Sequence, residues 1–213
     1  MTGEPMSLTL LLLFAYILGS VPFGLALGKV CCHVDLREHG SGNIGASNAW
    51  RVLGWKVGLP VFVLDLLKGF IPVLAGRLVS EHRSWASWAV VGAGMFAILG
   101  HNVSPFLKFK GGKGVATSLG VALGLSWKAA LAGFAAWAVV LALTGFISVA
   151  SLVGTPVGAY LIWYLNGGSL PYALFAILAT AFVVVKHIPN MRRLVVGRES
   201  SISWALLSRI RKK

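Results

Sequence analysis

The chain has 213 residues, of which 57% are hydrophobic and 12% are charged, and its formal net charge is +13. A mean hydropathy of +0.81 and recurring apolar runs near the length of a bilayer-spanning helix predict an integral membrane protein and argue against a soluble domain. No aromatic and basic interleaving on a soluble region accompanies the positive charge. We therefore expect the basic residues to face anionic lipid headgroups and not nucleic acid.

The apolar residues fall into segments that we expect to be helices. The first follows an N-terminus that holds Glu4 and no basic residue, which favours a retained helix over a cleaved signal peptide. The fourth is shorter than a perpendicular span of roughly 20 residues, so we expect it to be tilted, kinked or partly interfacial. The pattern predicts an all-α integral membrane protein with about seven transmembrane helices in a single polytopic domain, residues 1–213. The segments run roughly over 6–30, 57–79, 85–100, 114–127, 129–145, 147–166 and 170–186.

The positive-inside rule predicts the orientation of these segments. With the N-terminus outside, the cytoplasmic segments carry most of the 19 lysines and arginines, whereas the outer loops hold only Arg77, Arg83 and Lys128. We therefore expect a cytoplasmic C-terminus that ends in a basic tail, residues 200–213. Attraction to membrane lipids is the simplest role of that tail, and we assign it no other function.

Three polar segments remain, and the predicted topology places all of them on the cytoplasmic face. In the first, “HGSGNIGASNAWR”, Gly42 and Gly45 permit turns that can point backbone N–H groups at a phosphate. Ser47, Asn48 and Arg51 follow at helical spacing, so one helix face can present a hydroxyl, an amide and a guanidinium. The alternative is a flexible loop that ends in an N-capped interfacial helix. A dinucleotide-binding fingerprint is disfavoured, because the charged “CCHVDLREH” before the glycines is not a buried strand.

The second polar segment, “GHNVSPFLKFKGGKGVATSLG”, places lysines among glycines. Lys110 and Lys113 flank Gly111 and Gly112, and a helix is expected to begin just after them. Two ammonium groups and a helix N-terminus can together hold an anion. The Walker A pattern does not fit the segment. We expect Lys108 to be only a determinant of topology.

The third polar segment, “KHIPNMRRLVVGRE”, follows the last predicted span. His187, Asn190 and Arg193 occur three residues apart and are candidates for the same site. Pro189 argues against an unbroken membrane helix, so we expect the chain to bend or restart before Arg193. A histidine at an interface is as readily structural as functional, and for His187 both interpretations stay open.

Together the three segments resemble the three signature motifs of the PlsY family, the acyl-phosphate:glycerol-3-phosphate acyltransferases of bacterial membranes. The likeness extends from “AYILGSVPFG” to Glu199, and the combination is far more specific than any one motif. It implies a seven-helix fold in the bacterial inner (cytoplasmic) membrane, with the active site facing the cytoplasm. It also implies acyl transfer from acyl phosphate to the 1-hydroxyl of glycerol 3-phosphate, the first step of phospholipid synthesis, giving lysophosphatidic acid and phosphate. An acyl-phosphate synthase is then a possible upstream source of the donor.

The resemblance also implies which residues bind the substrates. His101 and Lys113 fall on further positions of the second motif, and Ser47 stands where many relatives carry threonine, which offers the same hydroxyl. The positions that match glycerol 3-phosphate contacts are Ser41, Arg51, Lys110, His187 and Asn190; those that match the loop around the acyl phosphate are Gly42, Asn43, Ser47 and Asn48. Gly45, Gly111, Gly112 and Arg193 complete the predicted substrate-binding set.

The chemistry of these residues suits such a reaction. An acyl phosphate is an activated anhydride, so positioning and charge stabilisation can carry much of the rate without a covalent nucleophile. We expect no metal and no cofactor, because the 6 acidic residues are scattered along the chain. His101 is a possible general base, but no carboxylate follows it closely in sequence to orient it. We therefore expect a substrate phosphate oxygen or water to accept the proton.

Two questions stay open at the level of sequence. Asp65 and Lys68 lie three residues apart within a predicted span, where charges are costly, and they can form a structural ion pair or contact substrate. The alternative function is a transporter of an organophosphate or another anion, which would share the basic, glycine-rich sites. Transport predicts related repeats in the two halves of the chain, and none is visible.

Overall fold

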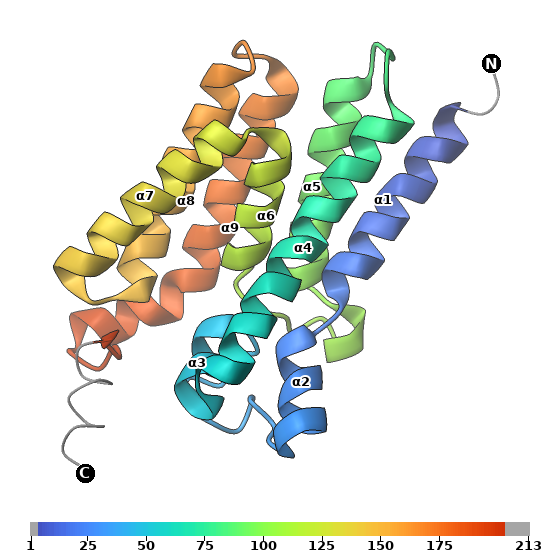
Figure 1. The fold of residues 1–213 in the computed structure, drawn as a ribbon. Helices are drawn as coiled ribbons and strands as arrows, with labels where there is room; N and C mark the ends of the chain where they lie inside the picture. The colour runs from blue at the N-terminus through green and yellow to red at the C-terminus, as the bar shows by residue number, and fades with distance from the viewer. Residues whose placement is uncertain (1–3, 203–213) are drawn as a thin grey trace.

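The computed structural model describes residues 4–202, and every regular element in that part of the chain is helical (Figure 1). A single 3₁₀ turn, Pro105–Leu107, lies between α5 and α6. Most of the basic tail predicted for 200–213 lies outside the described residues. The helices are α1 (Glu4–Ser20), α2 (Phe23–Cys32), α3 (Ala46–Leu53), α4 (Trp55–Val79), α5 (Ala86–Asn102), α6 (Val115–Leu125), α7 (Trp127–Thr144), α8 (Ile147–Leu165) and α9 (Leu170–Val195).

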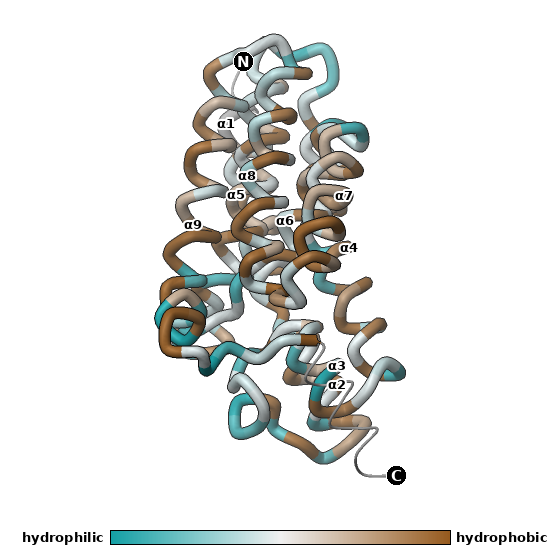
Figure 2. Tube along the Cα trace, turned by 90° about the vertical axis from the view of Figure 1, so that its left-hand side faces the viewer, coloured by the Kyte–Doolittle hydropathy of each residue, from teal (hydrophilic) through white to brown (hydrophobic). Residues whose placement is uncertain are grey.

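The membrane character of the fold is confirmed by the lengths and surfaces of these helices. Within the described residues, 6 segments are long and apolar enough to cross a bilayer, the first of them formed by α1 and α2 together. The fourth predicted segment corresponds to α6, which has 11 residues. At about 1.5 Å per residue it is roughly 16 Å long, well short of a hydrocarbon core of about 30 Å. Figure 2 shows hydrophobic residues along the long helices and hydrophilic residues at their ends.

Glycines let neighbouring helices approach until their backbones touch. A Cβ at Gly69 of α4 would collide with the backbone carbonyl of Thr117 in α6, and a Cβ at Gly120 of α6 would collide with that of Leu66 in α4. Small residues at such crossings allow backbone packing in membranes, where no hydrophobic effect drives helices together. The α4–α6 crossing therefore fixes the start of α6 against the middle of α4.

The last helix passes through Pro189 without a break. We expected the chain to bend or restart before Arg193, and a restart is excluded because α9 is helical from Leu170 through Val195. A proline removes one N–H donor but has a φ that suits a helix, and membrane helices tolerate it where neighbours pack around the freed groups. His187 and Asn190, on either side of Pro189, are only 2% and 5% exposed, so tertiary packing holds one face of this turn, whereas Pro189 itself is exposed.

Candidate active site

The three polar segments lie at the same end of the bundle, as the sequence predicted. In Figure 1 the chain around α2 and α3, the connection from α5 to α6 and the C-terminal end of α9 all gather at the lower end of the view. The helices between them carry these segments from distant parts of the sequence to one place. The candidate site is therefore built where the segments meet.

Asn48 holds the first segment in shape. Its side chain is 2% exposed, and its Nδ2 donates to the carbonyl oxygens of Leu36, His39 and Asn43 at 3.1, 3.0 and 2.8 Å. Its Oδ1 accepts from the backbone N–H of Ser41 at 2.9 Å. Because every polar atom of this amide already has a partner inside the protein, the structure gives Asn48 the role of fixing the loop.

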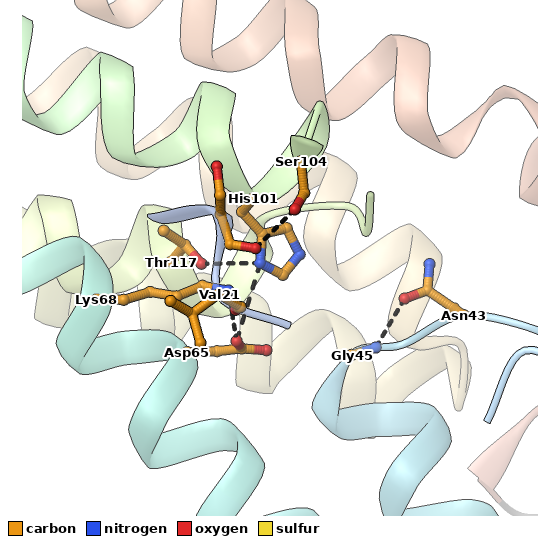
Figure 3. A network of polar contacts seen from close by, with 9 residues as sticks. Val21, Asn43, Gly45, Asp65, Lys68, His101, Ser104 and Thr117 are labelled. Atoms are coloured by element: carbon orange, nitrogen blue, oxygen red, sulfur yellow. Dashed lines mark hydrogen bonds and ion pairs between the residues drawn. The ribbon is translucent and has the colours of Figure 1, made fainter. Parts of the chain in front are cut away.

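The other predicted groups of the first segment are more accessible. Ser41 and Ser47 are exposed, and Arg51 is half-buried on α3, as the helical spacing predicted. Gly42 has a φ of 70°, in the left-handed region that glycine adopts without strain. The half-buried Asn43 uses its Oδ1 to accept from the backbone N–H of Gly45 at 2.9 Å, which closes the turn before α3 (Figure 3). The segment thus presents two hydroxyls and one guanidinium beside a fixed loop.

The glycine loop, residues 110–114, rests on the C-terminal end of α5. The backbone N–H of Gly111 donates to the carbonyl of Asn102 at 3.2 Å, and that of Gly112 donates to the carbonyl of His101 at 3.1 Å. Lys186 of α9 donates to the same Asn102 carbonyl at 2.8 Å. A Cβ on Gly112 would collide with Nε2 of His101, so only glycine lets the loop lie this close. Within the loop, the side chain of Lys110 is exposed and that of Lys113 is partly buried.

Glu199 organises the third segment. Its Oε1 accepts from Asn190 Nδ2 at 2.6 Å and from the Ser148 hydroxyl of α8 at 2.9 Å, and its Oε2 accepts from Arg193 Nε at 2.9 Å. Burial opposes ionisation of this carboxyl, but the hydrogen bonds from Asn190, Ser148 and Arg193 outweigh it and hold its pKa below the usual value. The chain after α9 is therefore tied back against α8 and α9 by one ionised side chain.

Lys113 links the second and third segments by contact and lies within electrostatic reach of the first. Its Nζ donates to Asn190 Oδ1 at 2.6 Å, which links the glycine loop to α9. Burial lowers the pKa of the Lys113 ammonium to about 8, Glu199 opposes that effect, and the charges of Arg193 and Arg51 lower the pKa further. One cation of each polar segment thus stands within electrostatic reach of the others. Such a cluster can bind an anion with several oxygen atoms, such as a phosphate.

The two histidines of the predicted site are both buried but differ in their surroundings. His187 is 2% exposed, and its Nδ1 lies 2.8 Å from the Val183 carbonyl, which can only accept, so the proton sits on Nδ1. His101 is 4% exposed and its Nδ1 lies 3.9 Å from Oδ1 of Asp65 (Figure 3). The sequence offered no carboxylate near His101, whereas the fold supplies one from α4.

The sequence interpretation gave no role to several residues that the structure places beneath or beside the site. For Glu199 the sequence did carry a signal, because this residue ends the third motif and is one of only 6 acidic residues. Ser148 and Lys186 carried no such signal, because a serine in an apolar run and a lysine at the end of a span are ordinary features. Among the described residues, no three His, Cys, Asp or Glu side chains come together as a metal site would require.

Comparisons with known proteins place these features in a family. The sequence matches the family described as glycerol-3-phosphate acyltransferase over residues 9–197. The glycerol-3-phosphate acyltransferase of Aquifex aeolicus is 41% identical over 189 residues, which cover 89% of this chain and 96% of that protein. That of Brucella canis is 44% identical over 191 residues, which cover 90% and 91%.

A solved structure gives the same result for the fold. The crystal structure of PlsY, an integral membrane glycerol 3-phosphate acyltransferase, in its glycerol 3-phosphate form matches this chain with a TM-score of 0.85 at 39% identity. The match covers 92% of this chain and 96% of that one. The helices that carry the three polar segments here therefore follow the fold of a membrane acyltransferase. On these grounds the chain belongs to the glycerol-3-phosphate acyltransferase family of integral membrane proteins.

Proposed function

We propose that this protein transfers an acyl group from acyl phosphate to the 1-hydroxyl of glycerol 3-phosphate at the cytoplasmic face of the bacterial inner membrane. The observation that carries the proposal is the contact of Lys113 with Asn190, within reach of the charges of Arg51, Arg193 and Glu199. This contact joins the second and third polar segments, and the charge of Arg51 adds the first to the same cationic cluster. Both proposed substrates carry phosphate. The family's name supports glycerol 3-phosphate as the acceptor.

We assign the substrates to groups at this cluster by their chemistry. Arg51 can form two parallel hydrogen bonds with a phosphate, and the exposed Lys110 supplies a further positive charge. Asn190 and His187 lie deeper and would orient the acceptor through hydrogen bonds. The exposed hydroxyls of Ser41 and Ser47, on the loop that Asn48 fixes, are placed for further phosphate oxygens.

The reaction needs no covalent intermediate on the protein. The oxygen of the 1-hydroxyl attacks the acyl carbonyl carbon, a C–O ester bond forms, and the C–O bond to phosphate breaks, so lysophosphatidic acid and phosphate leave. The proton of the hydroxyl passes to a phosphate oxygen of a substrate or to water. The cations stabilise the developing negative charge on the leaving phosphate, and this stabilisation with positioning supplies the rate enhancement.

The direct test uses purified protein in detergent with palmitoyl phosphate and glycerol 3-phosphate. We expect lysophosphatidic acid to form, and we expect no product from palmitoyl-CoA or palmitoyl acyl carrier protein in a preparation free of acyl-phosphate synthase. Absence of product with acyl phosphate would refute the proposal. Uptake of glycerol 3-phosphate into sealed vesicles without product would favour the transporter alternative.

Variants test the assignment of the cationic groups. Arg51→Ala and Lys110→Ala should each raise the KM for glycerol 3-phosphate or abolish turnover, because each removes a charge-assisted contact worth about 1.5 to 3 kcal/mol. Arg51→Lys should also be impaired, since an ammonium does not reproduce a planar fork. Lys108→Ala, an exposed lysine of the same connection, is the matched control and should keep normal kinetics. Normal kinetics in the Arg51 and Lys110 variants as well would remove both residues from the site.

A further inference from the structure

A polar cluster lies buried beneath the glycine loop and has no part in the proposed contacts to substrate. It consists of Asp65 and Lys68 on α4, His101 on α5 and Thr117 on α6, and we call it the buried tetrad (Figure 3). Its members are 2%, 2%, 4% and 0% exposed in that order. The protein therefore encloses these four side chains almost completely.

The contacts of the tetrad connect three helices and the junction between α1 and α2. Lys68 Nζ lies 2.9 Å from Asp65 Oδ1 and donates to the carbonyl of Val21, between α1 and α2, at 2.8 Å. His101 Nδ1 lies 3.3 Å from the Thr117 hydroxyl and 3.9 Å from the same Asp65 oxygen. The carboxylate and the hydroxyl therefore both face one nitrogen of the ring. A neighbouring carboxylate favours the tautomer whose proton is on that nitrogen, which fixes the orientation of the imidazole.

The opposite edge of the imidazole supports the glycine loop. Nε2 of His101 lies so close to Gly112 that a Cβ on that residue would collide with it, and the His101 carbonyl accepts from the Gly112 N–H at 3.1 Å. The ring and its backbone thus form the floor on which the loop turns. Lys110 and Lys113 stand on either side of this supported turn.

We propose that Asp65, Lys68 and Thr117 are positioning residues that lock the His101 ring and thereby fix the glycine loop with its two lysines. Asp65 and Lys68 are in this view neither ligands of the substrate nor only a means of holding helices together. A buried ion pair is weak evidence for a purely stabilising role, because apolar residues of similar size often give equal or greater stability. Because Gly112 covers Nε2 of His101, that nitrogen is not available to accept a proton from a substrate hydroxyl. In this proposal the ring supports the loop and does not act as the general base. The part of this proposal that concerns lysines and substrate rests on the proposed function, whereas the part that concerns the loop does not.

The test replaces the pair without leaving an unpaired buried charge. In the double variant Asp65→Leu/Lys68→Met both charges are removed together, and Thr117→Val removes the hydroxyl while it keeps the shape of the side chain. Arg77→Met is the matched control, because Arg77 of α4 donates to the carbonyl of Gly124 in α6 at 2.8 Å and so ties the same two helices at their other end. The three proteins and the wild type are compared in Tm, in loop accessibility and in kinetics.

Loop accessibility is measured without substrate. Trypsin cleavage after Lys110 and Lys113 is followed by mass spectrometry in detergent, with cleavage after Arg83, in the exposed connection between α4 and α5, as the internal reference. We expect cleavage in the loop to be about 10-fold faster in the double variant and about 3-fold faster in Thr117→Val, since an ordered turn is cleaved through its opened state. Arg77→Met should cleave like the wild type, even where its Tm is lower. Wild-type cleavage rates in both the double variant and Thr117→Val would overturn the proposal.

Kinetics give the second readout. The KM for glycerol 3-phosphate should rise about 10-fold in the double variant with a smaller change in kcat, because the lysines that hold the phosphate are displaced. In a Lys110→Ala background the same double change should add less than it does alone, which is the mark of groups that act together. Full additivity would contradict the coupling.

If the double variant does not fold, Thr117→Val decides, because it leaves the ion pair intact. If no variant or wild-type protein turns over acyl phosphate, the proposed function fails while the cleavage result still decides the role of the tetrad.

Discussion

The sharpest prediction concerns pH and a single proton on Lys113. Burial lowers the pKa of this ammonium from 10.5 to about 8, with Glu199 opposing and the charges of Arg193 and Arg51 contributing. At pH 7 about 90% of the free enzyme then carries the charge, and at pH 9 about 10% does. A phosphate monoester, with its second pKa of about 6, stays doubly ionised across this range.

We therefore expect kcat/KM for glycerol 3-phosphate to fall about 10-fold between pH 7 and pH 9, because this ratio reports groups on the free enzyme. The fall in kcat should be smaller, since a bound phosphate favours the charged ammonium. Lys113→Arg should keep some activity and lose the pH dependence, because a guanidinium does not titrate here. The assay is product formation at saturating acyl phosphate, corrected for hydrolysis of the donor at each pH.

The stability of the fold changes in the opposite direction, which separates the two effects. The folded-state pKa of Lys113 lies below its unfolded value of 10.5, so between about pH 8 and pH 10.5 the unfolded chain binds the extra proton. The contribution of this group to the free energy of unfolding therefore rises with pH in that window. Deprotonation of Lys113 thus does not unfold the protein, and unfolding at this group does not explain a loss of activity at pH 9. A flat kcat/KM up to pH 10, or an equal fall in Lys113→Arg, would refute the reasoning.

Other predictions follow from the contacts around the site and between the helices. Asn48→Ala should lower stability by about 3 kcal/mol, at about 1 kcal/mol for each of the two amide protons shared among three carbonyls and for the oxygen that accepts from Ser41, and should reduce turnover; thermal unfolding and kinetics check both. Glu199→Gln should move the fall in kcat/KM to lower pH, because Glu199 is the charge that raises the pKa of Lys113, and an unmoved profile would contradict this. Gly120→Ala should prevent normal folding, since its Cβ would meet the backbone of α4, whereas Gly158→Ala, whose Cβ would have 3.5 Å to its nearest neighbour, should be tolerated; yields and Tm values in detergent compare the pair.

Part of the site could be predicted from sequence because its signals are local. Hydrophobic runs mark membrane helices wherever they pack, and glycines beside lysines mark a loop that can bind an anion. The helical spacing of Asn48 and Arg51 was likewise readable, and α3 confirms it. The spacing did not reveal that the amide of Asn48 donates to carbonyls of its own loop, because those partners depend on how the loop folds back.

By itself, then, the sequence determined the class of fold, the approximate positions of the apolar helices and the three polar segments with their charges. Only the tertiary structure decided which side chains face one another. Asp65 stands beside His101, and Glu199 accepts from Ser148 across 51 positions of sequence, because helices packed through glycine set those distances. Continuation of α9 through Pro189 was decided in the same way. Local propensity is a property of neighbouring residues in the chain, whereas packing can outweigh it and is fixed only when the whole bundle has assembled.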